Sequence, residues 1–365
     1  MLEFNRYAIS SFKNSNNLHS IFDILRGVCA IVVFLGHLRG VFFSNYQDLK
    51  DAGIITDLFY FLTGFGHEAV IFFFFLSGYF IASVIERDYN KGTFIWTDYL
   101  LKRFLRFQVI LLPVLLVTCL LDTIALNQSS VYHLGLLQGF VTPKESVNVS
   151  LTLFFTNLLS LQSLVGTHYG SNSPLWSLSY EFLYYLIYPV LFLLVKKRLY
   201  FYASLLIAIM TLVSPNVMFL FPCWLVGSLF FYTKINNKNI ISLLILPLVL
   251  LTNRVLELGY VGDLILSISI FLFFSWFRPK LKLRSDFRLT MRKFSYLMAS
   301  ISFSLYLIHM PLIAFTHFLA GKFKIGTIPT LSICIILVVL FTLVLSRLDN
   351  KHTVIFDYLK NKRFI

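Results

Sequence analysis

Ten apolar segments, most of them near 20 residues long, divide this sequence and limit what it can fold into. A helix needs about 20 consecutive apolar residues to cross the hydrocarbon core of a bilayer, where only helices and closed barrels satisfy their backbone hydrogen bonds. The segments therefore predict an all-α fold, a polytopic membrane bundle of about ten transmembrane helices. The expected spans are residues 22–43, 64–85, 105–125, 178–195, 199–214, 217–233, 240–253, 259–277, 295–319 and 328–346.

The composition agrees with this class. Hydrophobic residues make up 58% of the chain and charged residues 13%, whereas soluble domains are about 25% charged. A net charge of +14 would favour nucleic-acid binding in a soluble protein, but here it is explained by basic cytoplasmic loops. The four cysteines lie in apolar segments without the spacing of metal ligands or of a disulfide framework, so we interpret them as packing residues and predict no metal site.

Basic residues predict the orientation. With the N-terminus inside, and with residues at span ends counted to the adjacent side, 24 of the 31 Lys and Arg residues fall on the cytoplasmic side, six fall outside, and Arg26 lies within a span. The positive-inside rule then places both termini in the cytoplasm. The shorter apolar segments 131–141 and 151–165 are expected to be interfacial or re-entrant. Two spans there would preserve the orientation, so twelve is the alternative number. The polar start of the chain argues against a cleaved signal peptide.

Arg26 and His37 lie eleven residues apart in the first expected span. On a helix their side chains differ by about 20° in direction and about 16 Å in height. Ionisable residues within spans are costly and usually face the interior of the bundle. The pair therefore predicts a passage that begins near the cytoplasmic side and reaches the outer half of the membrane. The alternative is that Arg26 snorkels and pairs with Asp23, while His37 bonds a backbone carbonyl.

Two further elements have simpler explanations when each is taken alone. Ser77 and Gly78 place a hydroxyl and a close helix approach in the second span, which helix packing alone explains. Arg103 and Arg106 lie one helical turn apart, an arrangement that suits a bidentate grip on phosphate. Ordinary anchoring of the helix on the cytoplasmic side is the alternative for the arginines.

Two more spans carry ionisable residues in their outer halves. Glu181 is expected about one turn below the outer boundary, at a depth comparable with His37, where a carboxylate can orient an imidazole. His309 is expected about 20 Å above the inner end of its span, beside Pro311, which removes a backbone hydrogen bond. A structural role for His309 at that break is the alternative, and Trp176 is also explained as an interfacial aromatic residue.

Taken in order, these residues resemble acyltransferase family 3, the integral-membrane acyltransferases that modify bacterial surface glycans. The resemblance spans nearly the whole chain, and one position departs from the family pattern, where Tyr79 replaces a phenylalanine. The matching elements are Arg26-x10-His37, Ser77-Gly78-Tyr79-Phe80, Arg103-x-x-Arg106, Trp176-Ser-Leu-x-x-Glu181 and Tyr306-Leu-x-His309-x-Pro311.

The resemblance implies O-acyl transfer from cytoplasmic acyl-CoA, usually acetyl-CoA, which acts as a substrate and not as a permanently bound cofactor. The implied acceptor is a hydroxyl of a surface glycan or lipid-linked oligosaccharide, such as lipopolysaccharide O-antigen, capsule or exopolysaccharide, and no nucleic acid is involved. The implied location is the bacterial inner membrane. Residues 1–365 are expected to form a single membrane acyltransferase domain. The extracytoplasmic esterase-like domain of some relatives is not expected, because only 19 residues follow the last expected span.

The charges suggest where the donor binds. Arg103 and Arg106 are expected to hold the anionic nucleotide end of the donor. Its uncharged pantetheine arm then passes Arg26 and the Ser77–Gly78 element.

The acyl group would then meet His37, which acts as a general base on the sugar hydroxyl. Glu181 is expected to orient or stabilise the His37 ring. His309, Tyr306 and Trp176 are expected to position the acceptor or to stabilise the oxyanion.

Three alternatives stay open at this stage. The first keeps the reaction but forms a covalent acyl-histidine. The second is a polytopic transporter or glycan-lipid flippase, because such proteins also use ionisable residues within spans. The third is a non-catalytic scaffold in an envelope assembly, which would leave the buried polar residues without a purpose.

Overall fold

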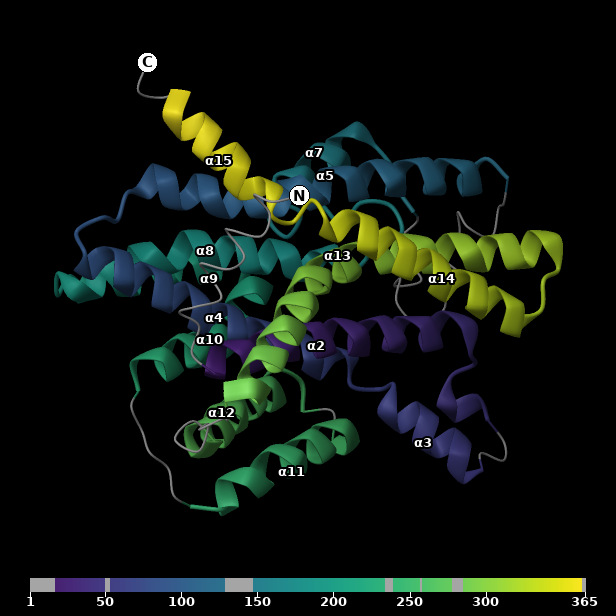
Figure 1. Cartoon of the computed structure of the whole chain (residues 1–365), viewed down its shortest axis with the longest axis horizontal. Coiled ribbons are helices and arrows are strands. Elements are labelled where there is room, and N and C mark those ends of the chain that lie inside the picture. The colour runs from purple at the N-terminus through teal and green to yellow at the C-terminus, as the bar shows by residue number, and fades with distance from the viewer. Residues whose placement is uncertain are drawn as a thin grey trace.

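The computed structural model describes residues 17–49, 53–128, 147–233, 239–256, 258–277 and 285–362, and over these residues all of its regular structure is helical. Each of the ten expected spans coincides with one helix (Figure 1). These helices are α2 (Asn17–Phe42), α4 (Gly66–Asn90), α5 (Trp96–Leu126), α8 (Leu175–Lys196), α9 (Tyr200–Val213), α10 (Pro215–Tyr232), α11 (Ile241–Leu256), α12 (Gly259–Phe277), α13 (Ser285–Phe323) and α14 (Thr327–Ser346). Short elements connect or follow them: η1 (Tyr46–Asp48), α3 (Ile54–Leu62), α7 (Leu151–Leu158) and α15 (Lys351–Lys362).

The prediction of an all-α membrane bundle is confirmed. Among the described residues, eight helical segments are long and apolar enough to cross a membrane. Helices α9 and α11, with 14 and 16 residues, are shorter. At 1.5 Å per residue they extend about 21 and 24 Å, less than the hydrocarbon thickness of about 30 Å. The number ten and the cytoplasmic position of the termini therefore stay predictions. Helix α7 is too short to span, and segment 131–141 lies outside the described residues.

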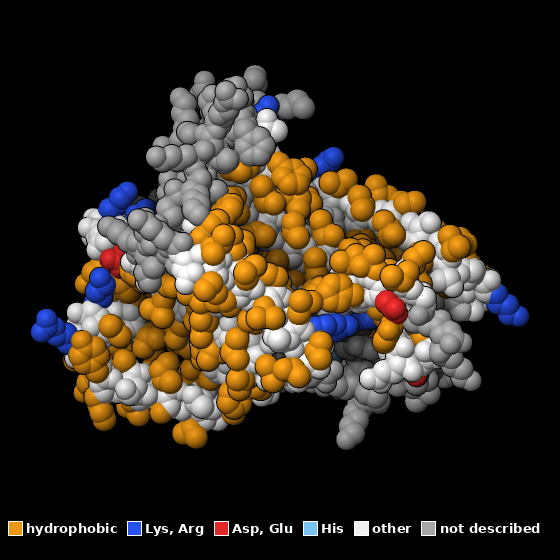
Figure 2. All heavy atoms as spheres, turned by 90° about the horizontal axis from the view of Figure 1, so that it is seen from below, with side chains coloured by type: hydrophobic (Ala, Val, Ile, Leu, Met, Phe, Trp, Pro, Cys, Tyr) orange, Lys and Arg blue, Asp and Glu red, His pale blue; other side chains and the backbone are white. Residues whose placement is uncertain are grey.

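The surface of the bundle is apolar, as contact with lipid requires. Large hydrophobic side chains are strongly exposed on α9 and α14, among them Phe201, Leu212 and Ile328. Figure 2 shows one face of the molecule that hydrophobic side chains largely cover, with most of the Lys and Arg side chains toward its ends. In water such a surface would associate, whereas in a bilayer it is the solvated surface.

Glycines set the distance between the central helices. Helix α2 packs against α13 where a Cβ atom on Gly27 would lie 2.6 Å from the Met298 side chain. Helix α4 packs against α10 where a Cβ atom on Gly78 would lie 2.0 Å from the backbone oxygen of Trp224. At the same crossing, a Cβ atom on Gly227 would lie 1.9 Å from the backbone oxygen of Phe75. Small residues thus allow the close backbone approach that is typical of membrane helix pairs.

The Gly78→Ala variant is therefore expected to be destabilised. The added methyl group meets backbone atoms, so α4 and α10 must separate, and overpacking of this kind costs typically about 1–3 kcal/mol. Thermal unfolding of the purified protein in detergent measures the effect. Gly321→Ala in α13 is the matched control, because nothing lies within 4 Å of its added Cβ. Unchanged unfolding of Gly78→Ala would contradict the packing role.

Asn172 donates a hydrogen bond to a backbone carbonyl of α13 that Pro311 leaves without its helical donor. Pro311 has no N–H group for the carbonyl of Leu307, four residues earlier. The Asn172 amide nitrogen, from the loop before α8, donates to this carbonyl oxygen at 2.9 Å. Asn172 is fully buried, so this bond ties the start of α8 to the middle of α13. Figure 1 shows that α13 changes direction along its length.

Candidate functional site

Two cavities lie between the central helices, and they contain most of the polar residues that the sequence singled out. The first, the Glu181 cavity, has a volume of about 440 Å³ and is also lined by Arg26, Arg103 and Arg106. The second, the His37 cavity, has a volume of about 350 Å³ and is also lined by Trp176. Both volumes are in the range of small-molecule sites.

The two cavities meet at Tyr306 and Val70, which line both of them. The buried Tyr306 hydroxyl lies 2.6 Å from Oγ of Ser177 and 3.3 Å from the carbonyl oxygen of Pro174, to which it donates. The ring of Phe73 packs edge-on against the Tyr306 ring, with 5.7 Å between centroids. A ligand that extends from one cavity into the other therefore passes the Tyr306 side chain.

The Glu181 cavity contains a chain of hydrogen bonds that ends on its carboxylate. Nε1 of Trp224 donates to Oγ of Ser77 at 3.1 Å, and Ser77 donates to the Tyr185 hydroxyl at 3.3 Å. Tyr185 in turn donates to Oε1 of Glu181 at 2.5 Å. Every donor in this chain points toward Glu181, so its carboxylate is the final acceptor.

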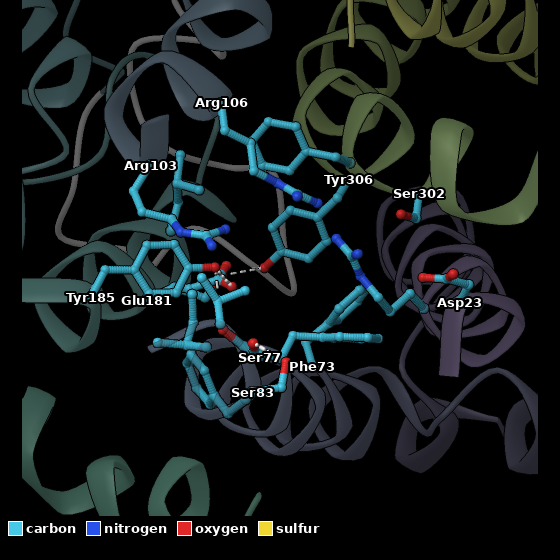
Figure 3. A pocket seen from close by; sticks show the side chains of 18 of the residues that line it. Asp23, Phe73, Ser77, Ser83, Arg103, Arg106, Glu181, Tyr185, Ser302 and Tyr306 are labelled. Atoms are coloured by element: carbon cyan, nitrogen blue, oxygen red, sulfur yellow. Dashed lines mark hydrogen bonds between the residues drawn. The ribbon is translucent and has the colours of Figure 1, made fainter. Parts of the chain in front are cut away.

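Two guanidinium groups of α5 share the cavity with Glu181 (Figure 3). Arg103 lies over the rings of Tyr99 and Tyr185, at 5.6 and 5.8 Å from their centroids. Its Nε atom is buried without a hydrogen-bond partner among the described residues. Arg106 lies within electrostatic range of Glu181 and of Asp349, which precedes α15. The arginines are thus held in place by aromatic rings and acids while retaining donor capacity for an anion.

The opposite wall of the Glu181 cavity comes from α2. Asp23 and Arg26 both line the cavity, one turn apart, and the Arg26 guanidinium lies 6.0 Å from the centroid of the Phe80 ring. Asp23 and Arg26 are thus neighbours, as the alternative interpretation of a pair requires, and both face the cavity. Arg26 and His37 line one cavity each along the same helix, as their spacing predicts.

His37 is paired with His309. Nδ1 of His37 lies 2.7 Å from Nε2 of His309, and the two rings are nearly parallel, with 17° between their planes. Nδ1 of His309 lies 3.0 Å from the carbonyl oxygen of Leu305, which can only accept. In the neutral pair, His309 therefore carries its proton on Nδ1 and accepts from His37 through Nε2. The proton of His37 is then on Nδ1, and its Nε2 is the basic nitrogen.

Two sequence interpretations need correction. The sequence predicts that Glu181 orients the His37 ring, but His309 occupies that position. Glu181 instead faces the other cavity, together with Tyr185 and the arginines. Gly78 lines neither cavity and faces α10, so it belongs to helix packing and not to donor binding. Its neighbour Ser77 does line the Glu181 cavity, as the sequence interpretation requires.

The remaining candidate residues lie at or beside the His37 cavity. Tyr306 and Trp176 line the His37 cavity, and His309 reaches it through its bond to His37. Trp176 packs edge-on against Tyr180, so it belongs to the wall of the site. Two further residues of this cavity, Arg39 and Arg254, were not singled out from the sequence, where they count only among the six basic residues expected outside. Basic residues are rare on that side under the positive-inside rule, and this rarity is the signal that could have identified them.

Comparison with known proteins identifies the class. A family model described as an acyltransferase domain, that of acyltransferase family 3, matches residues 19–347. The chain therefore belongs to this family and is a multi-pass membrane acyltransferase. No match was found among curated proteins or among solved structures.

Proposed function

We propose that this protein is an O-acyltransferase of the bacterial inner membrane, which moves an acetyl group from cytoplasmic acetyl-CoA to a hydroxyl of an extracytoplasmic or lipid-linked glycan. The observation that carries the proposal is the junction of the two cavities at Tyr306. A cavity lined by paired arginines and a cavity lined by His37 share Tyr306 as a wall residue there. This arrangement brings a charged donor and a neutral hydroxyl together from different sides.

The Glu181 cavity suits the donor. The nucleotide end of coenzyme A carries phosphates, and Arg103 and Arg106 provide paired guanidiniums from one helical face. The pantetheine arm is uncharged, so it can extend past Arg26 and Ser77 toward Tyr306 without an ionic partner. Glu181, which accepts a hydrogen bond from Tyr185, lies within electrostatic range of both arginines.

The His37 cavity suits the acceptor and the chemistry. Nε2 of His37 removes the proton of the sugar hydroxyl as the oxygen attacks the thioester carbonyl carbon. The tetrahedral intermediate then releases the thiolate of coenzyme A, which takes the proton back from His37. His309 accepts the hydrogen bond from Nδ1 and stabilises the positive ring in between. Tyr306 and Trp176 line the space in which the acceptor and the developing oxyanion lie.

The experiment that tests this function uses the full chain reconstituted in liposomes. Acetyl-CoA labelled in the acetyl group is supplied on one side, and glycan isolated from cells that lack the protein is supplied on the other. We expect the label on the glycan, with one coenzyme A released for each acetyl group transferred. A transporter or flippase would instead move the glycan unmodified and release no coenzyme A, and that result would overturn the proposal.

A further inference from the structure

Two arginines form one side of the His37 cavity, and neither has a role in the transfer chemistry described above. Arg39 lies in the last turn of α2, two residues after His37, and Arg254 lies in the last turn of α11. Both line the cavity together with His37, Trp176 and Tyr306. Two positive charges thus face the space in which the proposed acceptor lies.

Charges of the opposite sign are scarce around them. Among the described residues that line the His37 cavity there is no Asp or Glu, whereas Asp23 and Glu181 balance the arginines of the other cavity. Two buried acids lie next to this wall without lining the cavity, Asp263 and Glu68. Asp263 lies 2.7 Å from Nε2 of His67, and Glu68 is the next residue after His67 on α4.

The two guanidiniums are positioned for a shared ligand. Arg39 lies over the ring of Tyr60, 5.0 Å from its centroid, and its buried Nε atom has no hydrogen-bond partner among the described residues. Arg254 crosses the backbone at Gly64, where an added Cβ would lie 2.5 Å from its terminal nitrogen. The two arginines are close enough to repel each other. Holding two cations together, one of them with an unused buried donor, is costly unless an anion binds between them.

We propose that Arg39 and Arg254 bind an oxyanion of the acceptor, so that the protein selects an acceptor that carries an anionic group. This inference rests on the proposed function, because it takes the His37 cavity as the acceptor side. The oxyanion is either the carboxylate of an acidic sugar or the phosphate of a lipid-linked glycan. Each presents oxygen atoms to which guanidinium N–H groups donate. The anion would anchor the acceptor at one end of the cavity and leave a neighbouring hydroxyl beside His37.

The test measures equilibrium binding without any donor, so it does not depend on catalysis. The full chain in nanodiscs is titrated with a glucuronate-containing disaccharide, with its neutral glucose counterpart and with a short-chain prenyl pyrophosphate. We expect at least one of the two anionic probes to bind more tightly than the neutral disaccharide, and the preference to shrink as salt rises. Tighter binding of the acidic disaccharide identifies a sugar carboxylate, and tighter binding of the prenyl pyrophosphate identifies the lipid-linked phosphate.

Matched variants locate the binding site. Arg39→Gln and Arg254→Gln are each expected to weaken binding of the preferred anion by about 10-fold, the effect of one charge-assisted hydrogen bond, with neutral-probe binding unchanged. Gly64→Ala displaces the Arg254 guanidinium without changing the charge and is expected to act in the same direction. Lys324→Gln, an exposed cation that lines neither cavity, is the control.

Two results would overturn the inference. One is equal binding of all three probes by the unmodified protein. The other is a preference for an anion that survives in both arginine variants. Coenzyme A binding, measured on the same samples, reports separately on the Glu181 cavity. Failure of the acidic acceptor site is therefore distinguishable from failure of the proposed acyl transfer.

Discussion

Replacing His37 by alanine is expected to reduce acyl transfer by about 10²–10⁴-fold, the usual contribution of an acid–base group. The hydrogen bonds of the His37–His309 pair leave Nε2 of His37 as its basic nitrogen, and the ring lines the cavity in which we place the acceptor. Transfer of labelled acetyl groups to glycan in liposomes measures the loss. Coenzyme A binding should be unchanged, because the donor arginines lie in the other cavity.

The control for this variant is His317→Ala on α13. His317 packs edge-on against Phe42 at 5.5 Å and lines neither cavity, so full transfer is expected. His309→Asn should lose less activity than His37→Ala, because His309 acts on the substrate only through the His37 ring. Near-normal transfer by His37→Ala would exclude His37 from the reaction.

The unmodified enzyme can distinguish general-base catalysis by His37 from a covalent acyl-histidine mechanism. A general base transfers nothing until the acceptor is present, whereas a covalent mechanism forms acyl-His37 from the donor alone. Mixing the enzyme with labelled acetyl-CoA in the absence of glycan distinguishes them. One equivalent of released coenzyme A, with label retained on the protein and lost in His37→Ala, would favour the acyl-enzyme.

The helices were predictable from sequence because each depends on its own apolar segment. The Arg26–His37 relation was predictable for the same reason, since both residues lie on one regular helix and its geometry fixes their directions. All ten expected spans coincide with helices, although α9 and α11 are shorter than a straight span requires.

Relations between helices were less predictable. Glu181 lies on the expected helix, but it lines the cavity that does not contain His37. The rotation of α8 about its axis decides this, and that rotation depends on packing against other helices and not on the sequence of α8 alone. The hydrogen bond from Asn172 to the Leu307 carbonyl joins residues that are 135 positions apart, and no local sequence pattern predicts it. Gly78 was ambiguous in the sequence, since a small residue serves both packing and ligand approach, and only its contact with Trp224 decides between them.

Loss of both Arg103 and Arg106 is expected to abolish measurable coenzyme A binding, and each single Gln variant should weaken it by about 10- to 100-fold. A hydrogen bond to a charged group contributes more than a neutral one, and these guanidiniums also neutralise the phosphate charge. The effect should therefore decrease at high salt. Titration of the protein in nanodiscs with coenzyme A measures it.

The matched control lies on the same helix. Lys102 is exposed, lies over the Phe356 ring at 4.6 Å and does not line the cavity, so Lys102→Gln should bind coenzyme A normally. Acetyl-pantetheine, which lacks the nucleotide, provides a second control, because its weak binding should be insensitive to the arginine variants. If Arg103→Gln and Lys102→Gln were equally harmless, the arginines would only anchor α5 at the membrane surface. The anionic end of the donor would then need another partner in the Glu181 cavity, where the half-buried Arg26 is the next residue to replace.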